Sequence, residues 1–190
     1  MFRDLVQRSR AIRRFYQDQP VPMETLRELV DLARLAPTGS NLQSLKFFLS
    51  NQPEENALIF DTLAWAGYLR DWPGPQEGER PAAYIIILGD ATISKSFGCD
   101  HGIAAQTIML GAVEKGLGGC IIGSIKRLDL AAKLQIPPLF EILLVLALGK
   151  SKEIVKIEQV GSDGSVKYWR DAQQVHHVPK RSLEDIILLK

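Results

Sequence analysis

The stretch from Gly102 to Lys115 is long enough for a helix and apolar on nearly every side, which limits how this chain can fold. Its apolar residues are Ile103, Ala104, Ala105, Ile108, Met109, Leu110, Ala112 and Val113. Because apolar surface is unfavourable in water, protein must surround such a helix. In a chain of 190 residues, we expect a second subunit to supply part of that cover.

Four short apolar segments, mostly β-branched or aromatic, have the pattern of buried strands in one sheet. They span 46–49, 84–88, 120–122 and 142–148. Helices are expected between them. The clearest helix follows Val21-Pro22 and stops before Pro37 and Gly39. Residues 2–14 predict a short helix that leads into a basic loop.

The C-terminal part of the chain has weaker patterns. Residues 154–160 and 166–169 flank the turn-forming pair Asp163-Gly164, which predicts a β-hairpin. Ser182 is the expected N-cap of a final helical turn or two.

Composition limits the classes of partner. With 23 basic and 22 acidic residues, the formal net charge is +1, so no overall field favours nucleic acid or a membrane surface. The apolar runs are far below the roughly 20 residues of a membrane helix, and the N-terminus lacks a signal-peptide core. Two cysteines, Cys99 and Cys120, are too few for a disulfide framework or a four-ligand zinc site. We expect one domain over 1–190, in the cytoplasm.

Two segments carry polar side chains that could bind a ligand. Arg8–Phe15 holds several arginines that could converge on a phosphate; a solvated basic face explains them equally well, and RNA binding is a weaker third option. Ala36–Gln43 has small and amide side chains that suit the carbonyls of a heteroaromatic ring, although a plain turn also fits.

A third segment, Gly116–Ser124, is rich in glycine. It is not a dinucleotide-binding fingerprint, because its glycines end a helix and lead into a strand. Gly116 and Gly118 are expected to cap the preceding helix. Gly123-Ser124, after the strand, exposes backbone N–H groups that could face a ligand.

Taken in chain order, five segments resemble the nitroreductase family of flavoproteins. They are Arg8–Phe15, Ala36–Gln43, Asp100–Gln106, Gly116–Cys120 and Val178–Asp185. Their order and spacing carry the resemblance, which spans almost the whole chain. It implies an α+β fold, with a mixed, mainly antiparallel sheet flanked by helices, in an intertwined homodimer. Residues 150–190 would form a C-terminal arm that extends to the partner subunit.

The resemblance also implies which residues bind FMN. The arginine loop and the basic tail would hold the phosphate, the segment near 37–43 would meet the flavin ring, and the backbone after the glycine-rich strand would reach the flavin N5. These residues are Ser9, Arg10, Ala11, Arg13, Pro37, Thr38, Gly39, Asn41, Gln43, Gly123, Ser124, Lys180 and Arg181. The chain departs from the family at Ser9, Ala11 and Ser44, where Arg, Ser and Pro are frequent, so Arg10 would carry more of the phosphate charge.

The implied activity is a ping-pong reaction. NAD(P)H delivers hydride to the flavin N5 and leaves, and an electron-poor acceptor such as a nitroaromatic or quinone takes its place. No catalytic side chain is expected, because the flavin carries the chemistry. Two alternatives stay open: a flavin enzyme with a dedicated non-nitro substrate, and a non-catalytic dimeric ligand-binding protein on the same scaffold.

Three further clusters have simpler interpretations. Trp65, Tyr68 and Trp72, in a loop over 64–81, either line the substrate pocket as a lid or belong to the core. His176-His177 would point to opposite faces of a strand, so no metal site is expected. Asp100 is expected to cap the helix that follows it, beside Cys99 and His101.

Overall fold

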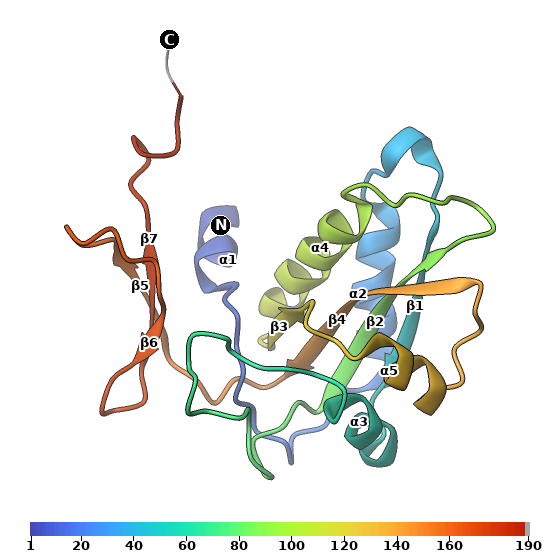
Figure 1. The fold of residues 1–190 in the computed structure, drawn as a ribbon, viewed down its shortest axis with the longest axis horizontal. Helices are drawn as coiled ribbons and strands as arrows, with labels where there is room; N and C mark the ends of the chain where they lie inside the picture. The colour runs from blue at the N-terminus through green and yellow to red at the C-terminus, as the bar shows by residue number, and fades with distance from the viewer. Residues whose placement is uncertain (189–190) are drawn as a thin grey trace.

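The computed structural model describes residues 1–188, and its centre is a four-stranded antiparallel sheet (Figure 1). The strands are β1 (Leu45–Ser50), β2 (Ala83–Asp90), β3 (Gly118–Ile122) and β4 (Phe140–Gly149), in the order β1-β2-β4-β3. The four expected segments therefore do form one sheet. A β-bulge between Ile87 and Leu88 shifts the register of β2 against β4.

Strand β2 is the most deeply buried element, because other parts of the chain cover both faces of the sheet. Every residue from Ala83 to Asp90 is buried. Successive side chains alternate between the faces. Ile85 and Ile87 contact one apolar cluster, while Tyr84 and Ile86 contact the other. This burial on both sides is why the sequence of β2 lacks polar alternation.

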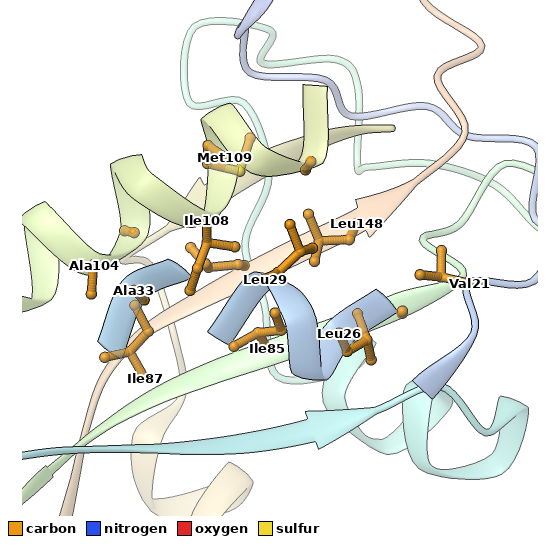
Figure 2. Close-up of a cluster of buried hydrophobic side chains, with 14 of the residues drawn as sticks. Val21, Leu26, Leu29, Ala33, Ile85, Ile87, Ala104, Ile108, Met109 and Leu148 are labelled. Atoms are coloured by element: carbon orange, nitrogen blue, oxygen red, sulfur yellow. The ribbon is translucent and has the colours of Figure 1, made fainter. Parts of the chain in front are cut away.

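Helices α2 (Met23–Leu35) and α4 (Asp100–Glu114) cover the first face of the sheet (Figure 2). Leu26 and Leu29 of α2 are fully buried in this layer, as expected from their helical spacing. The two helices approach closely at Gly111, where an added Cβ would lie only 2.6 Å from Leu32 Cδ1.

The apolar surface of α4 is covered largely within one chain. Ala104, Ala105 and Ile108 are buried, and Ile103 and Leu110 are half-buried. The sheet and α2 supply most of this cover, and α1 also packs against α4. The expectation that this helix needs a second subunit is therefore not supported by the helix itself.

The C-terminal end of α4 is closed by a glycine cap. Gly116 has φ +73°, its N–H donates to Val113 O, and the N–H of Leu117 donates to Ala112 O at 2.8 Å. The cap predicted at Gly116 is confirmed. The same prediction for Gly118 is wrong, because Gly118 begins β3 and a Cβ there would lie 2.8 Å from Ile12 Cγ1.

The second face of the sheet is covered by two short helices and the N-terminal segment. These helices are α3 (Pro53–Phe60) and α5 (Arg127–Lys133). Ile12 and Phe15 pack on the same face after α1 (Phe2–Arg8), which is the predicted short helix. A short 3₁₀ turn, η1 (Gly39–Asn41), precedes β1.

A separate three-stranded sheet follows β4 and lies to one side of the main body (Figure 1). It contains β5 (Val155–Gln159), β6 (Trp169–Arg170) and β7 (His176–Lys180), in the order β5-β7-β6. The pairing is mixed, since β5 and β7 are parallel and β6 and β7 are antiparallel.

The predicted hairpin over 154–169 is therefore wrong. The Asp163-Gly164 turn does form, with Gly164 at φ +68° and its N–H donating to Gly161 O. The two strands on either side of it pair with β7 and not with each other. Because the connection between β5 and β6 is long, the turn does not fix their register.

The chain after β7 forms a single turn, closed by the N–H of Ile186 donating to Leu183 O, where one or two helical turns were predicted. Ser182 and Asp185 exchange backbone and side-chain hydrogen bonds, so Ser182 does act as a cap. Four apolar side chains of this tail are exposed: Leu183, Ile186, Ile187 and Leu188. Residues 189–190 of the predicted arm lie outside the described residues. No helix in residues 1–188 is both long and apolar enough to cross a membrane.

Candidate functional site

The arginine loop after α1 is attached to the edge of the main sheet. Ala11 forms a bridge with Gly119, and the N–H of Ile12 donates to Gly119 O at 2.8 Å. A side chain at position 118 would collide with Ile12, so glycine there allows the loop to approach β3 closely. The loop therefore runs beside β3 and carries its arginines along this edge.

The two arginines expected to hold a phosphate lie in different hollows of the single chain. Arg13 lines a hollow of about 190 Å³ beside the end of β3, which we call the β3 hollow. Arg10 lines another hollow with Glu153, and its Nη2 donates to Val6 O at 2.7 Å. Burial lowers the pKa of Arg10. Within one chain, the expected convergence of arginines is thus not seen.

A buried carboxylate holds Arg13 in place. The side chain of Glu153 is fully buried, and its Oε2 accepts the N–H of Arg13 at 2.6 Å. Its Oε1 accepts from Arg170 Nη2 at 2.5 Å. The guanidinium of Arg13 lies 4.9 Å from the ring centre of Tyr168 and 3.3 Å from His176 Nε2. The second sheet thereby fixes the arginine loop.

The guanidinium of Arg14 is occupied by a second buried carboxylate. Arg14 donates twice to Glu79, at 2.6 and 2.7 Å, and Lys152 Nζ lies 3.1 Å from the same group. Hydrogen bonds from Arg14 hold the pKa of Glu79 at about 2, against an ordinary value of 4.5. Glu79 belongs to the 64–81 loop, so this cluster joins that loop to the arginine loop and to the segment after β4.

Gly123 and Ser124 lie at the end of β3, as predicted, and both line the β3 hollow. Gly123 O accepts from Arg127 Nη2 at 3.3 Å, and Ser124 O accepts the N–H of Ala64 at 3.0 Å. In a trans peptide the carbonyl and the next N–H point in opposite directions, so the N–H of Ser124 points away from Arg127. Neither N–H donates to another group within residues 1–188.

Only one of the three predicted loop aromatics reaches the β3 hollow. Trp65 lines it, and its buried Nε1 has no hydrogen-bond partner in the described part of the chain. Trp72 instead lies under Arg170, with 4.2 Å from the guanidinium to the ring centre. Tyr68 lies 5.0 Å from Tyr168, centre to centre. The loop is thus fixed to the second sheet on one side and to β3 on the other.

The segment with Pro37, Thr38, Gly39, Asn41 and Gln43 lies at the same end of the main sheet, before β1. The outer strands β1 and β3 are separated by three strand spacings, about 14 Å. Ser40, Asn41 and Gln43 have φ between 50° and 54°, which is unusual outside glycine. One chain therefore does not bring this segment to the β3 hollow.

Asp100 holds this strained segment. Its buried Oδ1 accepts the N–H of Gly39 at 2.9 Å. It makes no capping hydrogen bond to its own helix, so the cap predicted for Asp100 is wrong. The carboxylate is used for a contact distant in sequence, which no local pattern could indicate. Sequence reasoning also missed Glu79, Glu153 and Arg170, for the same reason.

The C-terminal pair Lys180 and Arg181 is exposed at the end of β7. Neither residue lines the hollows that contain Arg10 or Arg13. In the single chain, both cations are therefore exposed to solvent at the end of the second sheet.

The adjacent histidines point to different surroundings, as expected for a strand. His176 is buried, and burial lowers its pKa to about 4, so it is neutral at neutral pH. His177 contacts Asp171 and Glu158, which raise its pKa. Within residues 1–188, no cluster of three or more His, Cys, Asp or Glu side chains could hold a metal ion.

The comparisons with known proteins place this geometry in a family. A model of the nitroreductase family matches residues 6–150. The chain belongs to the nitroreductase family. YodC of Bacillus subtilis (strain 168), which carries the provisional name NAD(P)H nitroreductase, is 23% identical over 178 residues, covering 78% of this chain and 88% of YodC.

Solved structures of nitroreductase family proteins share the fold. One from Streptococcus pneumoniae TIGR4 is 18% identical and covers both chains completely, with a TM-score of 0.73. An FMN-dependent nitroreductase from Clostridium difficile R20291 is 23% identical and covers 78% of this chain and 87% of its own, with a TM-score of 0.63. The expected nitroreductase-like α+β fold is confirmed, and the likeness to the Streptococcus pneumoniae protein also takes in the second sheet that follows residue 150.

The Glu79 cluster predicts a pH dependence of stability. A carboxyl with a lowered pKa in the folded state stabilises the fold above its ordinary pKa of 4.5, and this stabilisation is lost as the pH falls toward about 2. We expect Glu79→Gln to lower the free energy of unfolding at neutral pH by about 2–4 kcal/mol. Denaturant unfolding over this pH range should show the deficit shrinking with acid. Glu77→Gln, at an exposed pair in the same loop, is the control; an equal effect there would contradict this prediction.

Proposed function

We propose that this protein is an FMN-dependent oxidoreductase that moves hydride from NAD(P)H to an electron-poor acceptor such as a nitroaromatic or quinone. Family membership and the FMN-dependent relative support this assignment. The observation that carries it is the β3 hollow, where Arg13, Trp65 and the unpaired N–H groups of Gly123 and Ser124 come together.

These groups suit a flavin ring and its side chain. Free backbone donors are what a ring nitrogen or carbonyl accepts from, and the Arg13 guanidinium suits an anion. The aromatic face of Trp65 suits stacking on a planar ring. Bound there, FMN would supply the hydride chemistry. The protein would bind and orient it: Arg127 and Ala64 hold the 123–124 backbone in place, and Trp65 excludes water.

A second subunit would complete the site. The segment with Thr38, Asn41 and Gln43 lies at the opposite edge of the sheet from β3, with the latter two side chains exposed. The tail and α1 also expose large apolar side chains, including Phe2 and Ile186. Such surfaces are rarely left open to water. In a homodimer, the arm over 150–190 and the 37–43 segment would contact the partner's flavin.

The first expected result is one FMN per subunit. The purified or reconstituted protein should be yellow, and the cofactor released by heat should run as FMN on chromatography. Steady-state oxidation of NAD(P)H should depend on a nitroaromatic or quinone acceptor. Released FAD would contradict the proposal, and a protein that binds no flavin after reconstitution would favour a non-catalytic ligand-binding scaffold.

The second expected result concerns the arginine loop. Arg13→Ala should weaken FMN binding roughly 10-fold to 100-fold, because a hydrogen bond to a charged group is lost. Arg10 lines a different hollow in the single chain, so an equal effect of Arg10→Ala is expected only through the second subunit of the proposed dimer. Arg3→Ala, at an exposed position of α1, is the matched control. Fluorescence titration with FMN measures all three. If all three variants bind FMN with equal affinity, the arginines of the loop form a solvated basic face and do not bind the cofactor.

The third expected result concerns assembly. A chain that ends at Arg181 keeps β7 and the Arg170–Glu153 pair but loses the apolar tail. We expect it to be monomeric and to lose FMN, because the site needs two subunits. Light scattering with flavin content measured in parallel tests both points. A truncated dimer, or a monomer that retains full FMN, would show that the tail is not needed.

A further inference from the structure

A hollow of about 230 Å³ lies between α3 and the C-terminal end of the 64–81 loop, and we call it the Tyr84 hollow. The residues that line it include Phe60 at the end of α3, Arg80 near the C-terminal end of the loop, and Tyr84 of β2. Proline and alanine side chains form much of the remaining wall. It shares no lining residue with the β3 hollow, so it is separate from the proposed flavin site.

Two buried groups of this hollow have no hydrogen-bond partner among residues 1–188. They are the hydroxyl of Tyr84, whose residue is 1% exposed, and the Nε of Arg80. The positive charge of Arg80 acts on the Tyr84 hydroxyl. Burial nevertheless raises the pKa of Tyr84 well above its ordinary value, so the hydroxyl keeps its proton. Unpaired buried polar groups are costly and rare.

The other polar side chains that line the hollow are already engaged. Asn56 accepts from Ser50 and donates to Ala82 O. The Oε1 of Gln17 accepts two backbone N–H groups, and Asn51 donates to Val21 O. What the hollow leaves free is therefore a hydroxyl and a guanidinium N–H. A ligand that satisfies both must bring acceptor oxygens, and negative charge suits the arginine.

We propose that the Tyr84 hollow binds a small organic carboxylate, with its oxygens at the Tyr84 hydroxyl and the Arg80 guanidinium and its apolar body against Phe60. Arg80 already lies over the Phe60 ring, 4.3 Å from its centre. Glu77, at 3.1 Å from Arg80 Nη1 and mostly exposed, competes for the same cation. A bound carboxylate would join α3 to the far end of the loop that carries Trp65.

Isothermal titration of the full-length protein with benzoate tests the proposal, with benzyl alcohol as the uncharged counterpart. Benzoate should bind at least 10-fold more tightly than the alcohol. Tyr84→Phe should weaken benzoate binding about 10-fold to 100-fold, because it removes one donor to a charged group. Arg80→Gln should weaken it similarly, and Glu77→Gln should strengthen it. Tyr16→Phe, outside the hollow, should leave it unchanged.

Folding of the variants can be judged separately. Tyr84→Phe keeps the ring and removes an unpaired buried hydroxyl, so its melting temperature without benzoate should be unchanged or higher. Arg80 is only half-buried, so Arg80→Gln is expected to fold. It provides a second measurement of benzoate affinity if Tyr84→Phe misfolds.

The proposal is overturned if benzoate does not bind, if the alcohol binds equally well, or if benzoate affinity is unchanged in both variants. The last result would place benzoate elsewhere on the protein. None of these titrations requires turnover, so a protein without flavin would refute the proposed function and leave this test intact.

Discussion

Two buried carboxylates, Glu79 and Glu153, determine how the parts of this chain fit together. Glu153 binds the backbone of Arg13 and the side chain of Arg170. Glu79 binds Arg14 and Lys152. Removing Glu153 would leave the buried guanidinium of Arg170 without this partner, and removing Glu79 would do the same to the half-buried Arg14. Breaking a buried pair in this way costs far more than the pair itself contributes. The arginine loop, the 64–81 loop and the second sheet thus have one relative arrangement.

The antiparallel sheet is the reason we propose a site shared by two chains. Its covered faces form the core, so ligand groups are available only at its edges and ends. Residues 37–43 precede one outer strand, and Gly123-Ser124 follow the other. Three strand spacings, about 14 Å of sheet, separate the two outer strands. Shape therefore favours a site shared between subunits over one completed within a chain.

The strained 37–43 segment is also fixed by a contact from another part of the chain. Three non-glycine residues with positive φ store energy unless neighbouring contacts fix them. Asp100, at the start of the buried helix α4, supplies such a contact through Gly39. The backbone of the segment is therefore fixed through Gly39, while the side chains of Asn41 and Gln43 remain exposed in the single chain.

The sequence by itself determined the main sheet, α2, α4 and the family, because apolar periodicity and the order of motifs are local properties of the chain. It singled out Arg13, Gly123 and Ser124 and left open whether Trp65 lies in the same pocket or in the core; all four line the β3 hollow. It misplaced the 154–169 pairing, the role of Asp100 and the cover of α4. Those features were decided only by the tertiary structure, since strand partners and buried ion pairs join residues far apart in sequence, where no short pattern records which of many partners is nearest.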